Sequence, residues 1–276
     1  MLKKVCLLFV LFWAASPVWA ATLRITVSTP PHAFVTSEIG GPFVQVQTLI
    51  DKGQDPHTFA PTPKQIMDLD QAVIMFTTGL PFEKPLVSQI RARNKKLLIV
   101  DLTRGLPTHT DADGDIDPHV WLSPPLLKIQ AAVIAGTLSK ADPAHAGEYK
   151  HNLARFTKAL QKIDQRIKIL LRPFAGRSFY VFHPAFSYFG TAYGLRQKAV
   201  EIGGGSPSPR QLARLIQQAR ADKVRIIFTA PQFDQRSAAV VAAAINGTVM
   251  PLNPLAHDVL KNFTKIARAL ETALKK

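Results

Sequence analysis

The sequence predicts an α/β protein with two lobes, each built on a mainly parallel sheet flanked by helices, and joined by one long helix. Two observations predict this class. Short apolar runs alternate with helical patterns in both the first and the last part of the chain, which is typical of parallel sheets covered by helices. Between these parts, residues 142–173 carry apolar side chains at alternating spacings of four and three, which places one apolar stripe along a single helix.

Residues 1–20 have the pattern of a signal peptide. Two lysines precede an apolar run over residues 5–15, and Val18-Trp19-Ala20 resembles a small-residue cleavage site. The run is shorter than the roughly 20 residues that a membrane-spanning helix needs. We therefore expect export to the periplasm, with a mature chain that begins at Ala21. The one cysteine, Cys6, lies inside this segment, so a metal site in the mature chain must use imidazole and oxygen ligands.

The charge of the chain is strongly basic, but its distribution argues against nucleic-acid binding. The net charge is +15, and it falls to +13 once the two lysines of the signal peptide are removed. The lysines and arginines are dispersed over several expected helices, and no aromatic-interleaved basic run accompanies them. Attraction to an anionic membrane surface or to an acidic partner agrees better with this pattern.

The first lobe is expected to span residues 21–140. Its predicted strands are residues 23–28, 43–49, 72–76 and 97–100. One helix is expected to begin at Thr62-Pro63-Lys64-Gln65, where threonine can cap the helix, proline suits the first helical position and glutamine can complete a capping box. Another begins at Ser123-Pro124 and continues to about Lys140.

The long helix is expected over residues 141–173, beginning near Asp142-Pro143 and ending near Arg172-Pro173. About 30 residues at 1.5 Å per residue give a length of roughly 45 Å. An ordinary core helix would have the same apolar stripe. We interpret the segment as a strut between two lobes, because the alternation of strands and helices stops before it and resumes after it.

The second lobe is expected to span residues 174–276. Strands are predicted at residues 178–182 and 225–229, and helices begin at Ser208-Pro209, near Arg236 and near Val259. Open parallel sheets bind ligands at the carboxyl ends of their strands. Two such lobes facing each other would therefore place a ligand in the cleft between them.

Three histidines next to prolines are the candidate binding residues. They occur in Asp55-Pro56-His57, Asp117-Pro118-His119 and Phe182-His183-Pro184. Proline fixes its own φ angle, and each aspartate can bond nearby backbone or the second imidazole nitrogen. Three neutral imidazoles from distant parts of a chain favour a zinc-type site. Three other histidines, at positions 32, 145 and 151, have no such context and are expected on the surface.

Several stretches, in the same order, resemble the zinc/manganese class of substrate-binding proteins of bacterial ABC transporters. The most specific is Asp55-Pro56-His57-Thr58-Phe59-Ala60-Pro61-Thr62-Pro63, which is similar to the family's first-ligand motif. The others are Ile39-Gly40-Gly41, Gly79-Leu80-Pro81-Phe82-Glu83, Asp117-Pro118-His119-Val120-Trp121, His183-Pro184-Ala185-Phe186-Ser187-Tyr188-Phe189 and Ser206-Pro207-Ser208-Pro209-Arg210. The resemblance covers nearly the whole mature chain. It implies metal bound between two α/β lobes, with His57, His119 and His183 as ligands.

The sequence departs from the family pattern in two places. The family's fourth ligand is usually a carboxylate near the start of the terminal helix, and Asn253 stands at that position here. We therefore assign Asn253 as the candidate fourth ligand, with water, His257 or Asp258 as alternatives. Zinc-specific relatives often have a histidine-rich insertion before the second ligand, whereas residues 108–117 form a short stretch with one histidine. We interpret this stretch as a solvated acidic loop.

These features favour a transport protein over an enzyme. We expect a monomer that captures Zn²⁺ outside the inner membrane and delivers it to the permease of an ABC transporter. Manganese or iron binding is an alternative within the same family, although these harder metals prefer carboxylates. A zinc-dependent hydrolase is a second alternative, since three histidines with an open fourth position also occur in hydrolytic sites. A His-Glu-x-x-His motif that would supply a general base does not occur in the sequence.

Overall fold

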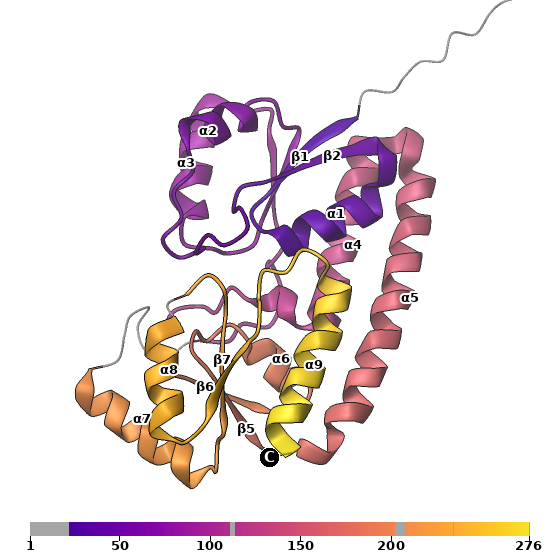
Figure 1. The fold of residues 1–276 in the computed structure, drawn as a ribbon. Coiled ribbons are helices and arrows are strands. Elements are labelled where there is room, and N and C mark those ends of the chain that lie inside the picture. Colours follow the sequence, from indigo (N-terminus) through magenta and orange to yellow (C-terminus); the bar gives the residue numbers. More distant parts are fainter. Residues whose placement is uncertain (1–21, 111–113, 202–207, 234, 276) are drawn as a thin grey trace, which may run out of the picture.

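The structure is a computed structural model that describes residues 22–110, 114–201, 208–233 and 235–275. The expected signal peptide lies outside these residues. The chain forms two sheets of four parallel strands, in the orders β2-β1-β3-β4 and β6-β5-β7-β8. The strands are β1 (Leu23–Val27), β2 (Val44–Thr48), β3 (Ile74–Thr77), β4 (Leu98–Asp101), β5 (Ser178–Val181), β6 (Arg196–Ala199), β7 (Ile226–Thr229) and β8 (Thr248–Pro251). The predicted fold class of two α/β lobes is confirmed (Figure 1).

The helices of the first lobe show which local sequence signals correctly predicted the start of a helix. They are α1 (Pro30–Gly40), α2 (Pro63–Leu69), α3 (Glu83–Arg93) and α4 (Pro124–Ala141), with short 3-10 turns η1 (Gly41–Phe43) and η2 (Val120–Leu122). The capping box that was predicted for α2 is present, because the backbone N–H groups of Thr62 and Gln65 each donate to the other residue's side chain. Helix α1 was not predicted. Its two initial prolines were interpreted as the end of a strand, but they occupy helical positions where no N–H is needed.

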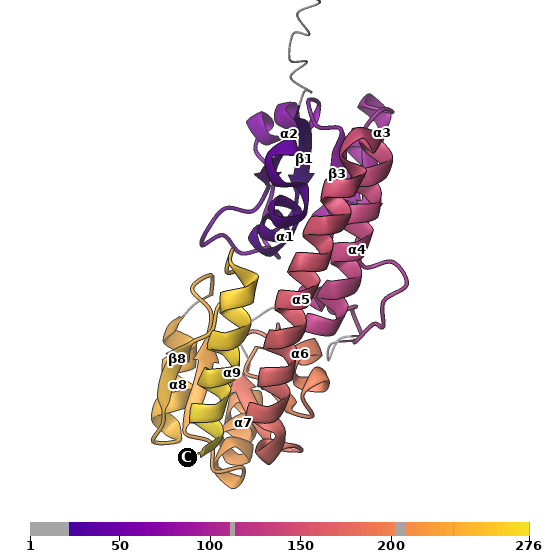
Figure 2. The same ribbon diagram turned by 90° about the vertical axis from the view of Figure 1, so that its right-hand side faces the viewer.

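The long helix is α5 (Ala146–Leu171), which has 26 residues. It begins later than the sequence indicated, because residues Pro143–His145 form a 3-10 turn, η3, instead of its first turn. In Figures 1 and 2, α5 lies beside both lobes, and α4 lies alongside the half of α5 next to the first lobe. Its buried face, including Tyr149, Phe156 and Leu160, belongs to one apolar core that contains residues of both sheets. The helix is thus both the connection between the lobes and part of their shared core. The lobe boundaries at residues 140 and 173 stay a prediction.

The second lobe contains α6 (Ser187–Ala192), α7 (Pro209–Ala221), α8 (Gln235–Ala244) and α9 (Val259–Lys275), after a 3-10 turn η4 (Arg172–Phe174). Helix α7 begins at the predicted Ser208-Pro209, and the structure adds a capping box between Ser208 and Gln211. A second, smaller core packs α7 and α8 against the sheet around Tyr180, Ile227 and Val241. Among the helices of the described residues, none is long and apolar enough to cross a membrane.

Candidate metal centre

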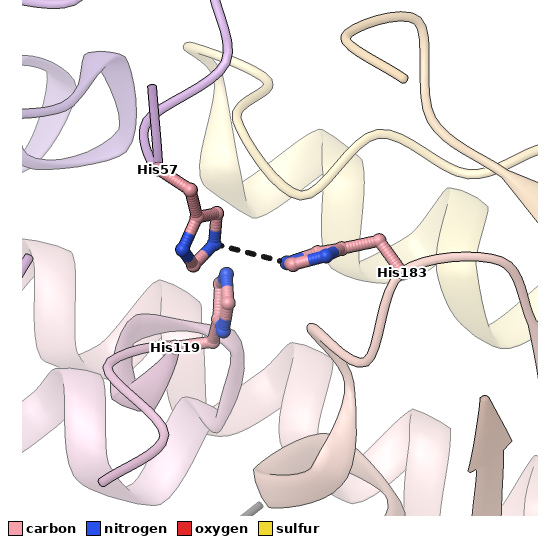
Figure 3. Close-up of side chains that lie close together, drawn as sticks. All are labelled: His57, His119 and His183. Atoms are coloured by element: carbon pink, nitrogen blue, oxygen red, sulfur yellow. Dashed lines mark hydrogen bonds between the residues drawn. The ribbon is translucent and has the colours of Figure 1, made fainter. Parts of the chain in front are cut away.

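His57 lies in the loop between β2 and α2, on the side of the first lobe that faces the second lobe (Figure 3). Asp55 shapes this loop: its Oδ1 accepts a hydrogen bond from the backbone N–H of His57 at 2.9 Å. Its Oδ2 accepts one from the hydroxyl of Thr58 at 3.4 Å. The aspartate of this motif therefore bonds backbone and a neighbouring side chain, and it leaves the imidazole to other partners.

His119 is held more tightly by the aspartate of its own motif. Asp117 Oδ1 accepts hydrogen bonds from the backbone N–H of His119 at 2.9 Å and from its Nδ1 at 2.7 Å. A carboxylate can only accept, so Nδ1 carries the proton and Nε2 keeps its lone pair. His119 is 4% exposed, and its ring centroid lies 5.1 Å from that of the fully buried Trp121.

His183 lies two residues after the end of β5 and comes from the second lobe. Its Nδ1 donates to Glu201 Oε2 at 2.8 Å, so its Nε2 also keeps a lone pair. One face of the ring stacks on Phe233, with centroids 4.2 Å apart and an interplanar angle of 20°. Neither contact was predicted from the sequence. Glu201 lies 18 residues from His183 and follows a strand that carries no apolar signal.

These three side chains meet between the lobes and form what we call the three-histidine site (His57, His119 and His183). One ligand atom from each ring lies within 4.8 Å of those of the others. The Nε2 atoms of His57 and His183 are 3.1 Å apart, and Figure 3 shows the three rings directed at one another. Zn–N bonds of about 2.0–2.1 Å in a tetrahedral site place two nitrogens about 3.3 Å apart. The spacing of the rings agrees with a shared ion.

The environment favours the neutral imidazoles that a metal requires. Desolvation lowers the pKa of His57 below 6.5, and the charge of His183 lowers it further. Burial likewise lowers the pKa of His183, against the opposing effect of Glu201. Burial disfavours ionisation of Asp117, but His119 and the hydroxyl of Ser187 outweigh it and hold the pKa of this carboxyl below 3.8. The imidazoles of His57 and His183 are therefore neutral near pH 7 and the carboxylate of Asp117 is ionised, which suits the binding of a cation.

Asn253 lies in the loop between β8 and α9, and its side chain has partners in the second lobe. Its Oδ1 accepts hydrogen bonds from Gln232 Nε2 at 3.0 Å and from the backbone N–H of Leu255 at 2.9 Å. An amide oxygen has two lone pairs, and both are engaged. Of the alternatives, His257 packs edge-on against Phe34, and Asp258 pairs with Lys261 at 2.9 Å. The assignment of Asn253 as a ligand stays a prediction.

The three histidines without motif context differ from one another. The expectation that His32 lies on the surface is wrong, because its side chain is 0% exposed. It bonds Thr29 Oγ1 at 2.7 Å and Gln130 Oε1 at 3.2 Å, and burial lowers its pKa to about 4. His145 is half-buried and pairs with Asp142, whereas His151 on α5 is exposed as expected. His32 occupies a buried position of α1, and no pattern in the sequence around it indicates that burial.

Known proteins share both the sequence pattern and this architecture. The family model described as ZnuA, zinc-uptake complex component A, periplasmic, matches residues 25–276. The chain belongs to this family. Members of the ZnuA family and its relatives differ in the metal that their names specify. The high-affinity zinc uptake system protein ZnuA of Paracoccus denitrificans is 27% identical over 85% of this chain and 83% of its own length.

A manganese protein and a solved structure are similar as well. The manganese ABC transporter substrate-binding lipoprotein PsaA of Streptococcus pneumoniae is 26% identical over 81% of this chain and 77% of its own length. A crystal structure of ZnuA is 36% identical, with a TM-score of 0.88, and the match covers 92% of this chain and 99% of that one. The two lobes and the connecting helix are thus the architecture of this ZnuA.

Proposed function

We propose that this protein captures a divalent metal ion, Zn²⁺ in preference to others, outside the inner membrane and delivers it to the permease of an ABC transporter. The observation that carries the proposal is the convergence of three imidazole groups from both lobes at a distance suited to one ion. Membership of the ZnuA family supports the transport role. The three-histidine site is the proposed binding site, and the periplasm is the proposed compartment.

Zinc is the proposed ion because of the atoms that the site offers. The three-histidine site supplies nitrogen, and the nearby carboxylates of Asp117 and Glu201 are bonded to the Nδ1 atoms of the candidate ligands. Imidazole suits Zn²⁺ well, whereas Mn²⁺ prefers carboxylate and carbonyl oxygen. Manganese is the second candidate, since the similar PsaA is named for that metal.

A binding role agrees better with this site than hydrolysis. A zinc hydrolase needs a base that is free to take a proton from metal-bound water. The carboxylates of Asp117 and Glu201 instead orient imidazoles, since each accepts a hydrogen bond from one of them. We propose that the protein is not an enzyme, that it acts as a monomer and that it does not bind nucleic acid.

Metal analysis tests the proposal directly. Purified protein is analysed for its elements, and metal-free protein is then titrated with Zn²⁺, Mn²⁺ and Fe²⁺ in competition. We expect one ion per chain and tightest binding of Zn²⁺. Preferred binding of Mn²⁺ would move the proposal to the manganese alternative, and binding of none of the three would refute it.

A further inference from the structure

His109 is a half-buried histidine outside the three-histidine site, and it takes part in contacts between the lobes. It comes from the loop between β4 and η2, but its ring packs on α6 of the second lobe. The ring is stacked on that of Tyr188, with centroids 4.0 Å apart and an interplanar angle of 4°. Its backbone N–H donates to Tyr188 Oη at 2.9 Å. Tyr188 is 2% exposed, so His109 covers a side chain that is fixed in the core.

A chain of hydrogen bonds leads from His109 to the candidate metal ligand His119. The hydroxyl of Ser187 donates to Asp117 Oδ2, and it can therefore accept from Nδ1 of His109, which lies 3.0 Å away. The other oxygen of the same carboxylate, Oδ1, accepts from Nδ1 of His119. Each donor in the chain is thus directed toward the carboxylate of Asp117, which fixes the plane of that carboxylate and with it the plane of the His119 ring.

The backbone around Asp117 is fixed by the same residues. Tyr188 Oη donates to the carbonyl oxygen of Asp117 at 3.0 Å. The N–H of Asp117 donates to the carbonyl oxygen of His109 at 2.9 Å. Ser187 and Tyr188 follow His183 by four and five residues, so these contacts join the segments that carry the second and third candidate ligands. We name His109, Asp117, Ser187 and Tyr188 the interlobe cluster.

We propose that His109 is a positioning residue that holds the two lobes in the arrangement where the three-histidine site binds its ion. The proposal rests on the metal-binding function proposed above. His109 acts through Ser187 and Asp117, and its contacts lie between the lobes instead of within either sheet. Its loss therefore removes one of the contacts that hold the His119 segment against α6, while the bonds from Ser187 and Tyr188 to Asp117 remain and the packing of each lobe stays in place. The consequence is faster release of the ion without a matching loss of stability.

Three substitutions separate the two contacts that His109 makes. His109→Ala removes the ring and the hydrogen bond, His109→Phe keeps a ring to stack on Tyr188, and His109→Asn keeps an N–H donor near Ser187. His151→Ala is the matched control, because His151 is exposed on α5. Each protein is loaded with Zn²⁺, and the dissociation rate is followed by stopped-flow mixing with excess chelator. The melting temperature of each metal-free protein is measured in parallel.

We expect His109→Ala to release Zn²⁺ about tenfold faster, within the range found for residues that hold metal ligands in place. His109→Asn recovers part of this loss and His109→Phe less, while His151→Ala matches the unaltered protein and all melting temperatures agree within about 3 °C. If His109 acts through Ser187, then Ser187→Ala combined with His109→Ala is no faster than the faster single variant.

Two results would overturn the inference about His109 and leave the proposed metal-binding function in place. One is a dissociation rate of His109→Ala within twofold of the unaltered protein. The other is a rate of the double variant equal to the product of the two single effects, which would mean that His109 and Ser187 act independently. If the unaltered protein binds no Zn²⁺ in the same assay, the proposed function fails and the inference fails with it.

Discussion

Replacing Glu201 by glutamine removes the negative charge that holds the imidazole of His183, and nearly preserves the shape of the side chain. The bond between Glu201 Oε2 and His183 Nδ1 is 2.8 Å long, and the two side chains are 9% and 7% exposed. Hydrogen bonds with one ionised partner are roughly twice as strong as neutral ones. Because both side chains are largely removed from water, the negative charge of Glu201 also offsets part of the double charge of the bound ion.

We expect Glu201→Gln to weaken Zn²⁺ binding by about 10- to 100-fold, the range measured for partners of this kind, which corresponds to about 1.4–2.7 kcal/mol. Competition with a chelator of known affinity measures the change. Glu148→Gln is the control, because Glu148 is an exposed carboxylate on α5 and the substitution makes the same change in charge. Equal affinities for the two variants would refute the argument that the Nδ1 partner of His183 contributes to binding.

The remaining predictions concern the site and its surroundings. Alanine at any position of the three-histidine site weakens Zn²⁺ binding by about 100-fold or more in calorimetric titration, because one strong metal bond is lost. His151→Ala leaves the affinity unchanged. A site histidine whose replacement has no more effect than that of His151 is not a ligand. Burial holds the pKa of His57 and His183 below 6.5, so the affinity for Zn²⁺ is constant from pH 8 to about 6.5. At lower pH the affinity falls by up to about tenfold per pH unit for each proton taken up. An affinity that is independent of pH down to 5 contradicts this. Asn253→Asp raises the affinity for Mn²⁺ by a larger factor than the affinity for Zn²⁺, because it adds a hard anionic oxygen. Equal changes in the two affinities would place residue 253 outside the ligand set. One equivalent of Zn²⁺ changes the fluorescence emission of Trp121, because its ring lies 5.1 Å from that of His119 and its Nε1 donates to the carbonyl oxygen of Pro254 in the other lobe. Constant emission during titration of protein that binds metal would contradict this.

Burial on both faces made part of the fold predictable from the sequence. The central strands β3 and β7 are apolar and wholly buried, and short apolar runs predicted both. The edge strands β6 and β8 carry polar or half-exposed side chains and were not predicted. These two strands are determined by pairing with their neighbours, which leaves no periodic pattern in a four-residue segment, whereas the edge strands β2 and β4 were predicted from apolar or alternating runs. The helices with capping boxes were predicted because a cap is local in sequence.

The candidate site was predictable only in its local motifs. The two Asp-Pro-His tripeptides indicated rigid presentation of His57 and His119, and the structure adds that Asp117, unlike Asp55, bonds the ring as well as the backbone. The bonds of Glu201 to His183 and of Ser187 to Asp117 cross 18 and 70 residues of sequence. The first contact depends on the pairing of β5 with β6 and the second on how the two lobes are placed, and no local pattern specifies either.

The coordination of a bound Zn²⁺ ion shows whether the three-histidine site holds it. X-ray absorption at the zinc edge of protein loaded with one equivalent of Zn²⁺ reports the number and type of its ligands. We expect three imidazole nitrogens at about 2.0–2.1 Å with a fourth oxygen or nitrogen ligand. A shell with fewer than three imidazoles, or one made mainly of oxygen atoms, would contradict a site in which His57, His119 and His183 hold one ion between the lobes.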